Sequence, residues 1–150
     1  KYRSEGIINN GILSPKKYEQ SWRTSKKKRD VEIIFGELGI SKLKISPKEK
    51  ETKKLDYKLL KNYNDPLTAF VNILIHSKPF DTIDGRRVYL LFPEKLKNKT
   101  LILINNYKNI WADHKRNDLE YLEFVQQSDL VLPEKIKIKF DGLIFTLTKN

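Results

Sequence analysis

The C-terminal end of the chain shows the most regular alternation of apolar and polar positions. From residue 135 to residue 140, each lysine is followed by an apolar residue, which is the two-residue period of a strand with one buried face. Asp141 and Gly142 come next, and both tolerate the positive φ angles of a tight turn. The pattern predicts a β-hairpin over residues 135–140 and 143–148. In this register Phe140 lies opposite Leu143.

Three other segments have the composition of strands. Residues 87–92 and 100–105 are almost continuously apolar, as expected for strands that are covered on both faces. Residues 30–45 hold two segments rich in β-branched residues, separated by Gly36 and Gly39. A helix that ends at Gly39 also fits this stretch, but the β-branched content favours a hairpin.

Four segments have the start signals and spacing of helices. Ser14-Pro15 and Ser46-Pro47 each place a capping hydroxyl before a proline that is suited to the first helical turn. They predict helices over about 15–28 and 47–62. Asp65-Pro66 predicts a third helix over 67–76, whose apolar residues have the spacing of a buried face. Asp118 caps a fourth expected helix, over 118–127.

These elements together predict a single-domain α+β fold. Three to four helices would pack on a mixed or antiparallel sheet that ends in the C-terminal β-hairpin. Residues 1–30 form a basic N-terminal segment with the helix at about 15–28, and residues 31–150 form the α+β domain. We expect the two parts to fold as one unit.

Composition narrows the possible chemistry. The 150 residues include no cysteine and two histidines, which excludes disulfides and thiolate metal sites and leaves too few ligands for a histidine-rich one. The apolar runs are far shorter than the roughly 20 residues of a membrane helix. We therefore expect no membrane association, an intracellular (cytoplasmic or nuclear) location and no cofactor.

The positive charge is concentrated at one end of the chain. The net charge is +11, and residues 1–30 carry nine cations and three anions. Within residues 23–29, five of the seven side chains are cationic. Such asymmetry is typical of proteins that bind an anionic partner, most often nucleic acid. The same run also fits the cation-rich C-terminus of a helix.

We expect the protein to be a nucleic-acid-binding domain of a larger protein that contacts phosphates through Lys and Arg clusters. Aromatic rings in such a site stack on exposed bases. The candidate nucleic-acid-binding residues are Lys16, Lys17, Trp22, Arg23, Lys26, Lys27, Lys28 and Arg29, together with the row Lys135, Lys137 and Lys139. The lysine row also fits a solvated face or a protected sheet edge. The pattern does not separate DNA from RNA.

Two other functions remain open. A protein-interaction module that docks on an acidic partner would have the same composition, with Trp111 as a possible anchor. A nuclease-like enzyme is the third alternative, because His114-Lys115-Arg116 lies between Asp113 and Asp118. Those groups include the base and the cations that metal-free phosphoryl transfer requires. The segments around His76, Asp81 and Glu51 are weaker candidates, and we assign no catalytic or metal-binding residue.

Overall fold

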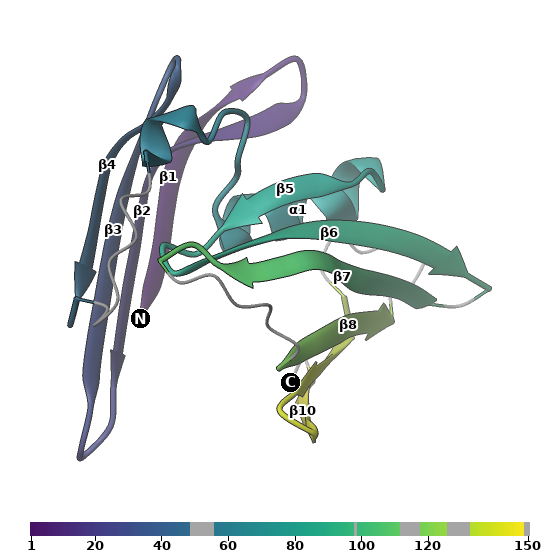
Figure 1. Cartoon of the computed structure of the whole chain (residues 1–150). Helices are drawn as coiled ribbons and strands as arrows, with labels where there is room; N and C mark the ends of the chain where they lie inside the picture. The colour runs from purple at the N-terminus through teal and green to yellow at the C-terminus, as the bar shows by residue number, and fades with distance from the viewer. Residues whose placement is uncertain (49–55, 98, 112–117, 126–132, 149–150) are drawn as a thin grey trace.

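Antiparallel β-structure makes up most of the molecule. The computed structural model describes residues 1–48, 56–97, 99–111, 118–125 and 133–148. They form a four-stranded sheet and a six-stranded sheet, with one α-helix that contacts both (Figure 1). Within these ranges no helix is both long enough and apolar enough to cross a bilayer.

The N-terminal sheet has its strands in sequence order, β1-β2-β3-β4, each antiparallel to the next. The bounds are β1 Tyr2–Asn9, β2 Ile12–Arg23, β3 Lys28–Gly36 and β4 Gly39–Ser46. The predicted hairpin over residues 30–45 is confirmed by β3 and β4. Residue 30, where the predicted N-terminal segment ends, lies inside β3.

The expected helix at 15–28 is wrong, because this segment forms most of β2 and the turn into β3. Pro15 does not start a helix but lies at a β-bulge, where the register between β1 and β2 shifts next to Gly6. A Cβ atom on Gly6 would lie 2.3 Å from the Ser14 carbonyl oxygen, so the bulge requires glycine. Proline is tolerated in strands at such bulges, where its missing N–H breaks no ladder.

The helix α1, Pro66–His76, confirms the third predicted helix. The Asp65 carboxylate accepts hydrogen bonds from the main-chain N–H groups of Leu67 and Thr68, which caps the first turn. The expected buried face is wrong at both ends, because Leu67 and Ile75 are exposed. The buried face of α1 includes polar residues instead, because α1 forms hydrogen bonds with the N-terminal sheet as well as packing on the C-terminal sheet.

The C-terminal sheet has the strand order β10-β9-β8-β7-β6-β5, all antiparallel. The bounds are β5 Phe80–Ile83, β6 Arg87–Leu96, β7 Lys99–Asn109, β8 Leu119–Val125, β9 Lys135–Phe140 and β10 Leu143–Thr148. The strands predicted at 87–92 and 100–105 are confirmed as parts of β6 and β7. The C-terminal hairpin is confirmed with its register, including the pair Phe140–Leu143.

Two hydrophobic cores hold these layers together. The first joins the N-terminal sheet to the end of β5, the start of β6 and the residue that follows β7, with Tyr18, Ile33 and Ile83 fully buried. The second packs α1 on the C-terminal sheet around Ile73 and Phe124. Both cores combine residues far apart in sequence, and the first core links the N-terminal and C-terminal sheets directly.

The predicted α+β class with three to four helices is therefore wrong. The described residues hold ten strands, one α-helix and a short 3-10 helix, η1, at Tyr57–Leu59. The helix expected at 47–62 would start directly after β4. Residues 49–55 of it lie outside the described ranges, and residues 56–62 contain only η1. The protein is mostly β.

The helix expected at 118–127 is also wrong, because residues 119–125 form β8. A bulge in β8 explains the error. Leu119 pairs with Phe140 and Leu122 with Ile138, so one extra residue between them brings both leucines to the same face of the sheet. Apolar residues three apart therefore share a buried face here as they would in a helix.

Candidate nucleic-acid interface

The largest group of predicted binding residues lies on one hairpin. β2 and β3 pair as far as Arg23–Lys28, and the main-chain N–H of Thr24 donates to the carbonyl of Lys27 at 2.8 Å. The Thr24 hydroxyl oxygen accepts from the main-chain N–H groups of Lys26 and Lys27, at 3.3 and 3.0 Å. We call residues 22–29 the basic arm.

The basic arm projects beyond the rest of the N-terminal sheet. Lys1 and Ser21 exchange main-chain hydrogen bonds beyond the Tyr2–Gln20 pair of β1 and β2, and the β3–β4 pairing ends at Asp30–Ser46. Pro47 follows, and proline has no N–H to continue a ladder. In the described part of the chain, residues 22–29 therefore have only each other as strand partners. Figure 1 shows the arm as the blue hairpin that extends past the end of β4 and past the N-terminus.

All eight residues of the basic arm are exposed, five are cations and none is acidic. Arg23 lies directly opposite Lys28, and like charges at opposed positions destabilise a sheet. A carboxylate is present only at the base of the arm, where Asp30 forms an ion pair with Lys28 at 3.0 Å. The Ser21 hydroxyl and then Lys28 hold the pKa of Asp30 below its ordinary value.

Trp22 forms the first cross-strand pair of the arm, with Arg29. Its side chain is 40% exposed, whereas Tyr18, on the same face of β2, is 1% exposed and belongs to the first core. The arm thus begins where the buried face of the sheet ends. Trp22 is available to a ligand, and Tyr18 is not.

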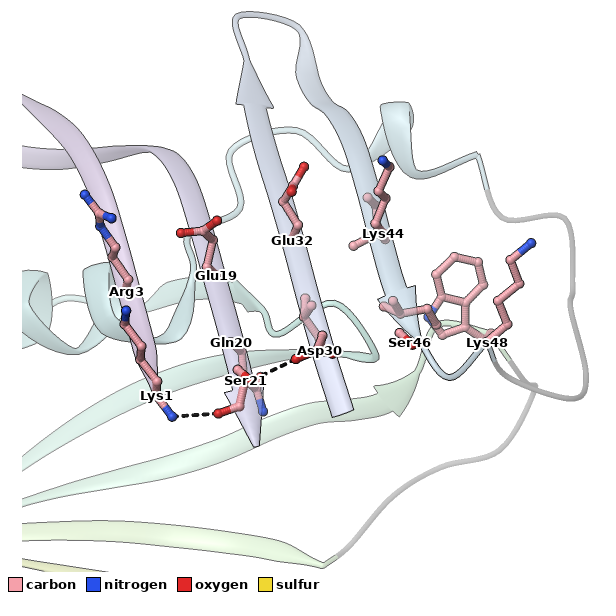
Figure 2. Close-up of a pocket in the computed structure, with 14 residues that line it drawn as sticks. Lys1, Arg3, Glu19, Gln20, Ser21, Asp30, Glu32, Lys44, Ser46 and Lys48 are labelled. Carbon is pink, nitrogen blue, oxygen red and sulfur yellow. Dashed lines mark hydrogen bonds between the residues drawn. The ribbon is translucent and has the colours of Figure 1, made fainter. Parts of the chain in front are cut away.

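The charged face of the N-terminal sheet has a different character from the arm. Cross-strand pairing places Arg3, Glu19, Glu32 and Lys44 in one row across the four strands, as Figure 2 shows. A hollow of about 850 Å³ is lined by these and other residues of the sheet. Cations and carboxylates are mixed there, with Glu19 beside Glu32, so the hollow does not present the uniform positive charge that a phosphate chain requires.

Lys16 and Lys17 lie on β2, toward the opposite end from the basic arm. Lys16 is exposed. The Lys17 ammonium forms an ion pair with Glu19 at 2.8 Å, and this hydrogen bond raises the pKa of Lys17. The structure does not bring these two lysines together with residues 22–29.

The row Lys135, Lys137 and Lys139 lies on β9 of the other sheet. Lys137 forms an ion pair with Glu123 at 3.2 Å, and Lys139 pairs with Glu120 at 2.6 Å. Both carboxylates come from β8, which we had predicted as a helix. Two lysines of the row are therefore paired with neighbouring acids, whereas in the arm only Lys28 has such an ion pair among the described residues.

The other candidate residues either make contacts within the fold or lie outside the described ranges. The Trp111 indole N–H donates to the Gly85 carbonyl at 2.9 Å, and the ring packs against the first core. His76 bonds to the Gly11 carbonyl. Residues 113–116, with His114, and residues 51–53 are not described. No group of three or more possible metal ligands lies close together among the residues that are.

Sequence analysis did not single out the residues that shape the arm. Thr24 and Ser25 belong to its turn, which spans residues 24–27, and Pro47 follows the end of the neighbouring ladder. A Thr-Ser pair between two polar segments is a recognisable turn signal. Comparison of the chain with protein-family models, with curated protein sequences and with solved structures found no match in any of the three.

Proposed function

We propose that the protein binds nucleic acid through the basic arm, with Lys and Arg side chains on the phosphates. The observation that carries this proposal is the concentration of five cations, without an acid, on eight exposed residues that project from the sheet. Opposed like charges cost stability in the free protein, and phosphates would relieve that repulsion. An intracellular location follows from the same proposal.

Salt dependence gives the first test. If five phosphates are neutralised, the slope of log K against log salt is about −4.5. Affinity should then fall roughly 500-fold between 50 and 200 mM salt. Fluorescence anisotropy with labelled DNA and RNA, single-stranded and duplex, measures this directly.

A matched pair of variants tests the location of the site. The arm variant carries K26Q, K27Q, K28Q and R29Q. The remote variant carries K61Q, K78Q, K95Q and K97Q, four lysines that are also exposed. Both lose four charges, but only the arm variant should weaken binding strongly and flatten the salt slope by up to about four.

Both variants should unfold at nearly the wild-type temperature, since exposed substitutions seldom change stability by more than about 0.5 kcal/mol. Equal losses of affinity in the two variants would mean that net charge alone attracts the ligand. No binding to any probe at 50 mM salt would remove the proposal.

A further inference from the structure

The length of the basic arm matches one dimension of duplex DNA. Beyond the Ser21–Asp30 pair, the arm continues through Trp22–Arg29, Arg23–Lys28 and the turn that Thr24 and Lys27 close. At about 3.4 Å per residue, these three steps extend it by roughly 10 Å. The major groove of B-form DNA is about 8.5 Å deep and about 12 Å wide, and it admits a two-stranded ribbon. The minor groove of undistorted B-form DNA is narrower, about 6 Å wide, and proteins that bind there commonly widen it or bend the duplex.

The cations of the arm lie on both of its faces. Successive side chains of a strand point to opposite sides, so the opposed pair Arg23 and Lys28 lies on the charged face of the sheet. Arg29 lies on the other face with Trp22. Lys26 and Lys27 lie at the turn. A ribbon that rests on a single backbone needs cations on one face, whereas a ribbon between two phosphate backbones needs them on both.

Trp22 lies at the base of the arm rather than at its tip. It belongs to the first pair beyond the sheet, so an inserted arm leaves its ring at the level of the phosphates and sugars. Aromatic residues of single-strand binding proteins stack on bases, whereas the ring of Trp22 at the base of an inserted arm lies beside the sugars. Groove insertion therefore uses the cations of the arm and not base stacking by Trp22.

We propose that the basic arm enters the major groove of B-form duplex DNA. Arg23 and Lys28 contact one phosphate backbone, and Arg29 contacts the other. Lys26 and Lys27 reach the base edges, where guanine offers two acceptors. This inference rests on the proposed function and adds the class of ligand. Duplex RNA is excluded, because its major groove is too narrow for side chains to reach the bases.

The first test of groove insertion compares the affinities of four nucleic-acid probes. Wild-type protein is titrated at one salt concentration against 20-base-pair duplex DNA, duplex RNA of the same sequence, and each single strand. Duplex DNA should bind at least tenfold more tightly than the other three. Comparable affinity for duplex RNA or for single strands would overturn groove insertion.

A second test blocks each groove of duplex DNA in turn and shows which groove the arm enters. In duplex DNA with glucosylated 5-hydroxymethylcytosine, sugars fill the major groove, and affinity should fall at least tenfold. Netropsin, which occupies the minor groove, should not compete. Unchanged affinity for the glucosylated duplex, or competition by netropsin, would overturn the inference.

Two variants separate the faces of the arm. The double variant R23Q/K28Q should reduce the salt slope by about two and R29Q by about one, each without a change in unfolding temperature. An effect from one face alone would contradict contact with both backbones. If the groove tests fail while the arm variant still binds more weakly than the remote variant, the nucleic-acid proposal survives and only the groove is wrong. If the two four-residue variants behave alike, the proposed function fails as well.

Discussion

Tyr18 and Trp22 are four residues apart on β2, and their different surroundings mark where the core ends. Burial raises the pKa of the Tyr18 hydroxyl well above its ordinary value, while Trp22 is 40% exposed. Positions four apart share a face in a strand as well as in a helix. The spacing of these two aromatics therefore did not distinguish the secondary structures, and it did not show which ring is buried.

At the same scale, Asp65 is the residue whose loss we expect to be most costly. Its side chain is fully buried, and besides capping α1 it accepts hydrogen bonds from the hydroxyls of Ser4, at 2.7 Å, and Thr68, at 2.6 Å. Asp65→Ala removes the cap and leaves two hydroxyls without this acceptor. We expect the free energy of unfolding to fall by about 2 to 4 kcal/mol.

Chemical denaturation measures that change. The control is Asp81→Ala, a substitution at an exposed aspartate, which should alter stability by no more than about 0.5 kcal/mol. Similar unfolding midpoints for the two variants would show that the hydrogen bonds of Asp65 contribute little.

At the scale of the elements, Glu123 ties three strands together. Its carboxylate on β8 accepts from Lys99 on β7 at 2.6 Å and from Lys137 on β9 at 3.2 Å. The side chain is 12% exposed, so solvent screens these contacts only partly. The hydrogen bonds from Lys99 and then Lys137 lower the pKa of Glu123.

The lowered pKa gives a pH-dependent prediction for Glu123→Gln. Because the pKa of Glu123 in the folded protein lies below its ordinary value of 4.5, the ionised carboxylate stabilises the fold above about pH 4.5, and this contribution is lost as pH falls through the folded-state pKa. The variant should be less stable by about 1 to 2 kcal/mol at pH 7. Thermal unfolding of both proteins from pH 7 to pH 3 should show the difference shrinking, and a constant difference would contradict the assignment.

At the scale of the whole molecule, the charged arm and an uncharged sheet edge lie in different sheets. β10 is an end strand of the C-terminal sheet, and Leu143, Ile144, Phe145 and Leu147 are each at least 50% exposed. Charged residues and prolines commonly protect a sheet edge from pairing with another chain. Residues 143–148 include neither. The net charge of +11 keeps copies apart at low salt.

We therefore expect self-association that increases with salt, as screening weakens the repulsion between copies. Phe145→Lys, which places a charge on the β10 edge, should suppress it. Leu38→Lys, at a turn residue that is 80% exposed, is the matched control and should not. Sedimentation velocity at 50 and 500 mM salt measures both, and equal association of the two variants would show that β10 is not the contact.

The sequence alone determined the elements whose signals are local. The hairpin at Asp141-Gly142 needs only alternation and a turn pair, and α1 needs only its cap and proline, so both were predicted correctly. The basic run and Trp22 were likewise visible as candidate ligand contacts. Their chemistry depends on residue type, and their exposure follows from the number of charges.

Tertiary structure decided what those residues form. The Ser14-Pro15 signal was overridden because β1 and β3 offer backbone partners on both sides of β2, and because Gly6 allows a bulge opposite Pro15. The helical spacing in β8 arose from a bulge that only pairing with β9 creates. Which lysines are compensated also depends on strands distant in sequence. The arm projects past β4 because the β3–β4 ladder ends at Asp30–Ser46, next to Pro47, and no local pattern within residues 22–29 contains that information.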